Sequence, residues 1–387
     1  MCCHVEFKQD AGCSYVINDN FANCDSMFRN KWPKRSIWVI GILSVFGAGF
    51  VLFWRAFHKE KNVAQSIMLI HVAVADGLMG VYLITIGAMD LAWTGVYYLH
   101  DFQWRTGLSC RIIGGISVFS SEVSIMVLSL LSVDRFKHIV FPKRFRVLNR
   151  KKAHGFCFLI WVVSFVIAFL PAFEIQYFYD PDKGIFYYGK SVVCLPLQLS
   201  SKFNAGWEYS VAIFVGLNLV FVLVIIAAYI MILFKTWLSK WRLSHQGTRR
   251  EIQARARTAD SRRETSLAKR IVLIILTDVA CWSPIIVIGV RTVVDEYFNI
   301  PGDIAVWFAV FVLPFNSAIN PVLYTFSTPQ VRTLFYPPFS FHFATLHQKT
   351  LHLIQLQRYS TFIHLKCVFS VPLLHRVNAV QSMNKRQ

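Results

Sequence analysis

An acidic and a basic residue stand side by side near the end of a long apolar segment, in the stretch LSLLSVDRFKHIVFP that runs from Leu128 to Pro142. Charges inside such a segment are costly, so Asp134 and Arg135 are expected to bind each other and a further partner. Glu264, in SRRETSLAKR, precedes another apolar segment at the level where Arg135 should lie. An Arg135–Glu264 ion pair would hold the two segments together. The alternative is an Arg135 side chain that simply reaches water from the helix end.

A carboxylic acid also lies in the middle of an apolar segment. Asp76, in HVAVADGLMG, requires a proton, a cation or several hydrogen-bond donors in this position. Ser124 in SSEVSIM is one candidate neighbour, and Asn316 and Asn320 in PFNSAINPVLY share a helix face because they are four residues apart. These oxygens predict a site for a monovalent cation, most plausibly sodium. The alternative is a protonated Asp76 held by hydrogen bonds.

Two prolines interrupt the apolar segments near the C-terminal end of the chain. Pro284 follows Trp282 in TDVACWSPI, and Pro321 lies in NPVLY. Each proline removes one backbone hydrogen bond and kinks a helix that contains it. Pro284 beside Trp282 therefore predicts a hinge.

The sequence contains no motif for hydrolysis, redox chemistry or nucleotide binding: GxSxG, paired CxxC, the P-loop and HExxH are all missing. The apolar segment that contains Pro321 has no lysine, which excludes a retinal Schiff base there. We therefore expect neither an enzyme nor a required cofactor. The formal net charge of +19 is accompanied by no basic–aromatic recognition motif, so nucleic acid is not an expected partner. The expected partners of the basic residues are anionic membrane lipids and an acidic cytosolic protein.

The lengths of the apolar segments decide the fold class. About 20 apolar residues cross a membrane as a helix, and charged residues make up only 16% of this chain against the roughly 25% usual in soluble proteins. We expect an all-α membrane protein, a seven-transmembrane helix bundle whose spans are about 36–57, 63–89, 106–139, 153–173, 206–234, 268–291 and 302–328. A short extracellular segment, 1–35, would precede the bundle, and a cytoplasmic tail, 329–387, would follow it.

The basic residues orient the bundle. The connection from Lys235 to Arg270 holds eleven basic and three acidic residues, whereas alternate connections are more acidic, which places the N-terminus outside and the C-terminus in the cytosol. Four basic residues just before the first span disagree with this orientation: Arg29, Lys31, Lys34 and Arg35. No apolar signal sequence precedes Ser36, and we expect an upstream part of the protein to have carried one; the alternative is a first span that acts as its own signal.

The orientation places several cysteines in an oxidising compartment. Cys110 begins the third span and Cys194 lies in the next outer loop, so we expect a disulfide that fixes this loop to the span. Cys2, Cys3, Cys13 and Cys24 are also outside, in pairings that the sequence does not assign.

Together these motifs resemble the rhodopsin-like G-protein-coupled receptors. The resemblance rests on ADGLMG, Cys110 with DRF, Trp161, Tyr229, CWSP and NPVLY, in this order. Within that family the chain is similar to the relaxin-type receptors with leucine-rich repeats, through ADGLMGVYL, SSEVS, IVFP, TDVACWSP and LPFNSAINPVLYT. Asp278, four residues before Trp282, is typical of the repeat-containing subgroup.

The resemblance implies roles for individual residues. Arg135 would contact a heterotrimeric G protein, of the stimulatory type that raises cyclic AMP, and Tyr229 would stabilise the active state. Asp278, Trp282 and Pro284, with Asn320, Pro321 and Tyr324, would form the activation switch. The signal would be a relaxin-like peptide hormone received at the plasma membrane.

The chain departs from the family pattern at several places, including Phe136 in place of the tyrosine after Arg135. Ala48 replaces the expected asparagine of the first span, and Phe221 replaces a common proline of the fifth. No L-x-x-L-x-L repeat precedes Ser36, so two further readings remain: a ligand-blind isoform that modulates a full-length receptor, and a seven-span transporter. The transporter reading is disfavoured because the two halves of the chain show no repeat.

Overall fold

A computed structural model of the chain describes residues 22–23, 25–58, 62–141, 148–181, 184–196, 205–245, 276–284, 286–291 and 311–326. The chain divides into two compact units, Met1–Ser327 and Thr328–Gln387. All of the described residues belong to the first unit, and the predicted cytoplasmic tail lies outside them.

Long apolar helices dominate the described part. They are α1 (Lys31–Phe57), α2 (Val63–Ala92), α4 (Leu108–Val140), α5 (Arg150–Phe169) and α7 (Asn218–His245). The short α6 (Trp207–Ser210) and a π-helical turn, Val211–Leu217, lead directly into α7. Five helical segments are long and apolar enough to cross a membrane among the described residues, since uninterrupted apolar side chains favour burial in lipid over water.

The remaining helical residues belong to the last two predicted spans. Residues 276–284 and 286–291 are helical, and α11 (Leu313–Phe326) contains Pro321. The predicted spans 268–291 and 302–328 lie only in part within the described residues.

Two elements in the outer connections were not predicted. The helix α3 (Tyr97–Thr106) joins α2 to α4, and a two-stranded antiparallel hairpin pairs β1 (Tyr179–Asp180) with β2 (Ile185–Phe186). Gly184 has a φ of +65°, a conformation that glycine adopts without strain, and this allows the chain to return after the turn. Both elements are too short for their hydrophobic periodicity to stand out in the sequence.

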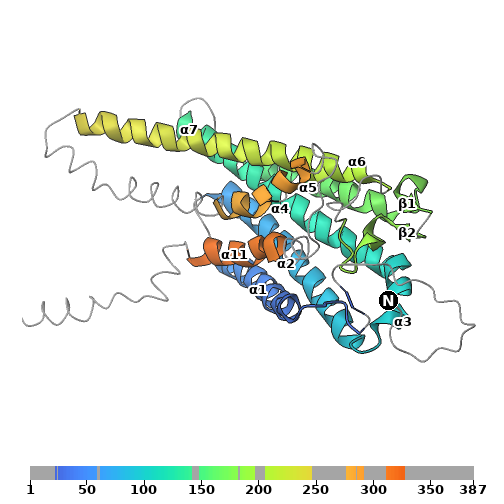
Figure 1. Ribbon diagram of the computed structural model, residues 1–387. Coiled ribbons are helices and arrows are strands. Elements are labelled where there is room, and N and C mark those ends of the chain that lie inside the picture. The colour runs from blue at the N-terminus through green and yellow to red at the C-terminus, as the bar shows by residue number, and fades with distance from the viewer. Residues whose placement is uncertain are drawn as a thin grey trace, which may run out of the picture. The chain divides into compact units, whose positions relative to one another are not determined.

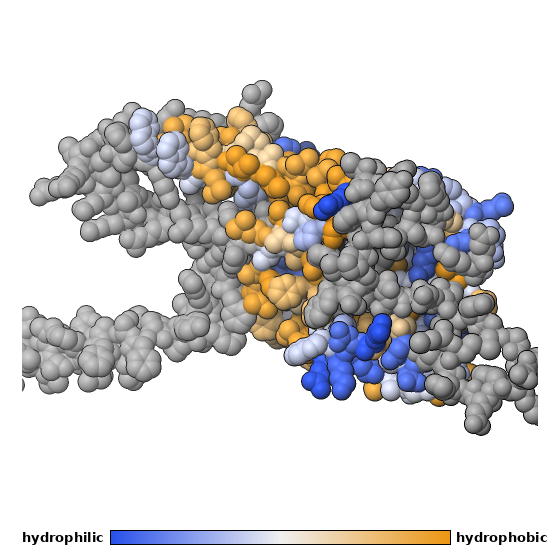
Figure 2. All heavy atoms as spheres, in the orientation of Figure 1, coloured by the Kyte–Doolittle hydropathy of each residue, from blue (hydrophilic) through white to orange (hydrophobic). Residues whose placement is uncertain are grey.

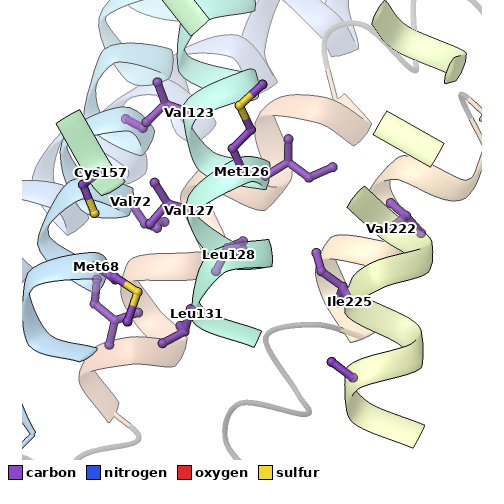
Figure 3. Packing of buried hydrophobic residues seen from close by; sticks show 14 of the residues in the cluster. Met68, Val72, Val123, Met126, Val127, Leu128, Leu131, Cys157, Val222 and Ile225 are labelled. Carbon is purple, nitrogen blue, oxygen red and sulfur yellow. The ribbon is translucent and has the colours of Figure 1, made fainter. Parts of the chain in front are cut away.

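The helices lie side by side in a bundle (Figure 1), with α4 in contact with α2, α5 and α7, and α1 in contact with α2 and α11. The main core lies between these helices. Figure 3 shows Met68 and Val72 of α2, Val127 of α4, Cys157 of α5 and Ile225 of α7 pointing toward one another. Among these apolar side chains, a buried polar group costs free energy unless it finds a hydrogen-bond partner.

Apolar side chains also cover the outside of the bundle. Large hydrophobic residues are exposed along α1, α5 and α7, including Phe46, Phe158 and Phe234, and Figure 2 shows apolar surface over these helices. A surface of this kind is suited to lipid rather than to water.

Close contact between α1 and α11 requires a glycine. A Cβ atom added at Gly47 would lie 2.7 Å from the Cβ of Pro321, whereas one added at Gly49 would meet no atom within 4 Å. Gly47 therefore lets the backbone of α1 approach the proline of NPVLY, one of the predicted switch motifs.

Candidate functional site

A disulfide fixes the second outer loop to the bundle. Cys110, at the start of α4, is bonded to Cys194, which has a φ of +54°. This was the predicted pairing. The Tyr82 hydroxyl donates a hydrogen bond of 2.7 Å to the carbonyl of Val193, so the loop is held beside α2 as well. We call this end of the molecule the outer end, and the end that carries Arg135 the inner end.

An ion pair in α3 lies beneath this loop. Arg105 is fully buried, and its Nε lies 2.7 Å from Oδ1 of Asp101, which also accepts a hydrogen bond from the Tyr97 hydroxyl. Burial raises the pKa of Tyr97, so this hydroxyl stays protonated and remains a donor. The neighbouring Trp104 donates from Nε1 to the carbonyl of Val192 at 2.8 Å. Thus α3 is a rigid support for the disulfide loop.

The residues before α1 are fixed to α2. Met27 and Phe28 are buried among the outer-end core residues, and the backbone N–H of Met27 donates to Oδ1 of Asp90 at 3.1 Å. The other oxygen of Asp90 lies 2.9 Å from Nζ of Lys34. Lys34 is one of the four basic residues that disagreed with the predicted orientation. The ion pair explains how its charge is accommodated at the outer end, because the buried carboxylate of Asp90 compensates it.

The middle of the bundle contains Asp76, fully buried in α2. The Ser124 hydroxyl of α4 donates to its Oδ1 at 3.4 Å. Asn320 and Ser317 of α11 lie close to the same carboxyl group. Oδ2 of Asp76 and both amide atoms of Asn320 make no hydrogen bond to the described residues, so oxygens from three helices remain available to a small ligand.

A second buried carboxyl group, that of Asp278 in the helical residues 276–284, is bound by α11 one turn before Asn320. Asn316 donates from Nδ2 to Oδ1 of Asp278, and both side chains are buried. Trp282, one turn after Asp278, packs in the main core. The structure thus brings Asn320 to Asp76 and Asn316 to Asp278, although the sequence placed both asparagines beside Asp76.

A third buried pair was missed by the sequence analysis. The amide of Asn218, the first residue of α7, donates a hydrogen bond of 3.0 Å to Oε1 of Glu122 in α4, and both residues are fully inaccessible. Glu122 is an isolated acid in the third predicted span. Asn218 gave no signal, since it lies in an otherwise uncharged segment.

At the inner end, Nη2 of Arg135 lies 2.6 Å from Oδ2 of Asp134, and only 6% of Arg135 is exposed. Asn62, just before α2, accepts hydrogen bonds of 2.8 and 2.9 Å from Nη1 and Nη2 of Arg135, in the amide orientation that satisfies both groups. The Tyr229 hydroxyl of α7 lies near both Ser132 and Arg135 of α4.

Several predicted features fall on residues that the structure does not describe. Glu264 lies outside the described residues, as do Cys2, Cys3, Cys13 and Cys24. Tyr324 lies in α11, but its side chain is outside the described part of the structure. Pro284 is described, and it lies half-buried in the helical stretch 276–284. The roles predicted for Glu264, Pro284 and Tyr324 therefore stay predictions.

The chemistry of these groups is that of binding and conformational change. Within the described ranges, no three His, Cys, Asp or Glu side chains are grouped closely enough to hold a metal ion. The buried pairs instead connect different helices: Asp76 with α4 and α11, Asp278 with α11, Glu122 with α7, and Arg135 with the start of α2. Such contacts can hold a helix bundle in one of two arrangements.

Residues 47–324 match the family model described as 7 transmembrane receptor (rhodopsin family). This match covers most of the chain. The protein therefore belongs to the rhodopsin family of seven-transmembrane receptors, and the predicted seven-helix bundle is confirmed. It is a multi-pass protein of the plasma membrane.

The chain is also similar to individual proteins that are named as receptors. The chain is 36% identical to G-protein coupled receptor GRL101 of Lymnaea stagnalis over 80% of its own length and 26% of that protein. It is 32% identical to relaxin receptor 1 of Homo sapiens, over 84% of the chain and 42% of the receptor. The thyrotropin receptor of Felis catus is 27% identical over 80% of the chain and 37% of the receptor. The chain thus spans less than half the length of these relatives. Its identity to relaxin receptor 1 confirms the predicted resemblance to the relaxin-type receptors.

Proposed function

We propose that this chain transmits an extracellular hormone signal to a heterotrimeric G protein, and that the G protein is of the stimulatory type that raises cyclic AMP. The observation that carries this proposal is the Asp134–Arg135 pair at the inner end of α4. A guanidinium that is 6% exposed inside an apolar bundle is expensive to keep there without a function. The relatedness to receptors named for relaxin at about a third identity supports the proposal.

Arg135 has the chemistry that such a contact requires. A guanidinium presents five N–H donors in a rigid fork and stays charged at all physiological pH values. If the inner end opens, the fork can bind backbone carbonyls at the end of a partner helix, where the helix dipole is negative. We assign to Tyr229 the role of stabilising the displaced guanidinium, because its hydroxyl lies near Arg135.

For the hormone we propose a relaxin-type peptide. The outer end supports a mechanical route for this signal: the residues before α1 are tied to α2 through Asp90, and the disulfide loop is tied to α2 and α4. A force on the extracellular segment would therefore act on the same helices that hold Asp76 and Arg135.

For the centre of the bundle we propose an allosteric sodium site. Oδ2 of Asp76, the Ser124 hydroxyl and the amide oxygen of Asn320 fit a small hard cation, which prefers oxygen ligands. Asn316, which the sequence assigned to this set, donates to Asp278 instead, and we place the pair Asp278–Asn316 with Trp282 in the activation switch.

The proposal is tested by cyclic AMP measurements in cells. The full chain, given a cleavable signal peptide and an epitope tag, should raise cyclic AMP at confirmed surface expression, and the Arg135→Ala variant at equal surface density should not. A relaxin peptide should increase the wild-type response. If the wild-type chain changes no G-protein readout at confirmed surface expression, the proposal fails.

A further inference from the structure

The contact between Asn62 and Arg135 joins the beginning of α2 to the end of α4. Two different N–H groups of the guanidinium donate to the single amide oxygen of Asn62, at 2.8 and 2.9 Å. In the opposite amide orientation the NH2 group of Asn62 would face a guanidinium that can only donate, so the hydrogen bonds fix the orientation. No feature of the sequence singled out Asn62.

The backbone position of Asn62 shows that its side chain is used for this contact rather than for the helix. Asn62 is the N-cap residue of α2, a position where asparagine is favoured because its side-chain oxygen binds an unpaired N–H of the first turn. Here the side chain makes no such bond; only the backbone carbonyl of Asn62 accepts from the N–H of Ser66, at 3.1 Å. The side-chain oxygen of Asn62 therefore binds Arg135 instead of capping α2, and the helix lacks the stabilisation of a side-chain cap.

The first turn of α2, which follows Asn62, is held against the end of α1. Arg55, in the last turn of α1, donates from Nη1 to the Ser66 hydroxyl in the first turn of α2, at 2.9 Å. Asn62 therefore presents its amide from a fixed corner between two helices. Asp134 binds Nη2 of Arg135 from the other side, so the same guanidinium is held by a neighbour on its own helix and by one on α2.

We propose that Asn62 is a positioning residue that holds Arg135 inside the bundle and thereby restrains the coupling of the receptor. This inference rests on the proposed function, in which Arg135 binds the G protein. Asn62 occupies one N–H of Nη1 and one of Nη2 and holds the guanidinium at the start of α2, so a partner helix that binds these groups must displace the Asn62 oxygen. Asn62 thus shifts the equilibrium toward the uncoupled state.

Three variants of Asn62 distinguish its contact with Arg135 from any effect on the N-cap of α2. Asn62→Ala removes both capabilities, and Asn62→Ser keeps a good N-cap residue whose hydroxyl is too short to reach Arg135. Both should raise basal cyclic AMP per surface receptor by about fivefold or more, the size of a typical coupling between two states. Asn62→Asp offers a charged acceptor and should lower basal activity below that of the wild type.

A neighbouring residue gives the matched control. Val63 is the first residue of α2 and is exposed, and no hydrogen bond of the site involves it. Val63→Ala should leave basal activity unchanged. A rise in Asn62→Ala that is absent in Asn62→Ser would mean that only the helix cap matters, and this result would overturn the proposal, as would unchanged basal activity in both.

A measurement without G protein keeps the inference separate from the proposed function. Thermal unfolding of the purified full chain in detergent is compared for Asn62→Ala, Arg135→Leu and the double variant. If the two residues bind each other, the double variant should lose clearly less in Tm than the sum of the single losses. Additive losses overturn the contact whether or not the receptor signals. Coupled losses in a chain that activates no G protein would support the contact and refute only the proposed function.

Discussion

Asn316 of α11 donates a hydrogen bond to the carboxyl group of Asp278, and this bond joins the last two predicted spans inside the bundle. Asp278 is fully buried, and its second oxygen has no hydrogen bond to the described residues. Among the described residues, the Asn316 amide is therefore the donor that offsets the free-energy cost of burying this carboxyl group.

The Asn316→Ala variant should lose more stability than the hydrogen bond alone contributes. The change leaves Asp278 buried without its donor, which costs about 1–3 kcal/mol, whereas replacing both partners by apolar side chains removes this penalty. Thermal unfolding should show that Asn316→Ala combined with Asp278→Ala is less destabilised than the sum of the two single variants. Additive losses would contradict a direct bond.

Gly47→Ala should disturb the contact between α1 and α11. The new methyl group would overlap Pro321, and overpacking of this kind costs about 1–3 kcal/mol. Gly49→Ala is the matched control on the same helix, since its methyl group meets no atom within 4 Å. We expect lower Tm and lower surface expression for Gly47→Ala only. Equal effects of the two changes would show a general response of α1 to alanine instead.

Loss of the disulfide should release the second outer loop. Cys194→Ser should lower the free energy of unfolding by about 2–5 kcal/mol, the usual effect of removing a native disulfide. The double change Cys110→Ser with Cys194→Ser should be no worse than either single change, because all three remove the same bond. Tyr82→Phe, which removes only one hydrogen bond to this loop, should cost about 1 kcal/mol. A Cys194→Ser variant as stable as the wild type would mean that the bond does not hold the loop.

Asp76→Asn should abolish a stabilisation by sodium. A cation that binds only the folded state raises Tm with its concentration, so the wild-type chain should gain Tm in sodium chloride relative to choline chloride of equal ionic strength. Ser121→Ala is a control in the same region, because the Ser121 hydroxyl bonds to the backbone of its own helix. Sodium sensitivity that persists in Asp76→Asn would rule out this site.

The sequence predicted the bundle because apolar segments of about 20 residues are a strong signal, and it predicted the disulfide because both cysteines share a compartment. It grouped Asn316 with Asn320 beside Asp76 because helix periodicity gives the face but not the level, whereas in the structure Asn316 donates to Asp278. Residues four apart differ by about 6 Å along the axis, which is enough to place Asn320 near Asp76 and Asn316 at Asp278.

Contacts between distant segments were harder to predict. Asn62 binds Arg135 across 73 residues of sequence, and Asn218 binds Glu122 from a segment without charge. Neither asparagine has a pattern around it that differs from an ordinary cap or loop residue. Such partners are determined by how the helices pack, so only the structure shows them.

The central claim is that Arg135 couples this bundle to a G protein, and nucleotide exchange on a purified heterotrimer tests it most directly. The full chain in lipid nanodiscs should accelerate exchange on a stimulatory G protein above the rate with empty nanodiscs. Arg135→Ala, shown to be folded by thermal unfolding, should return the rate to that of empty nanodiscs. Acceleration that is equal in wild type and Arg135→Ala, or none in the wild type, would contradict the account.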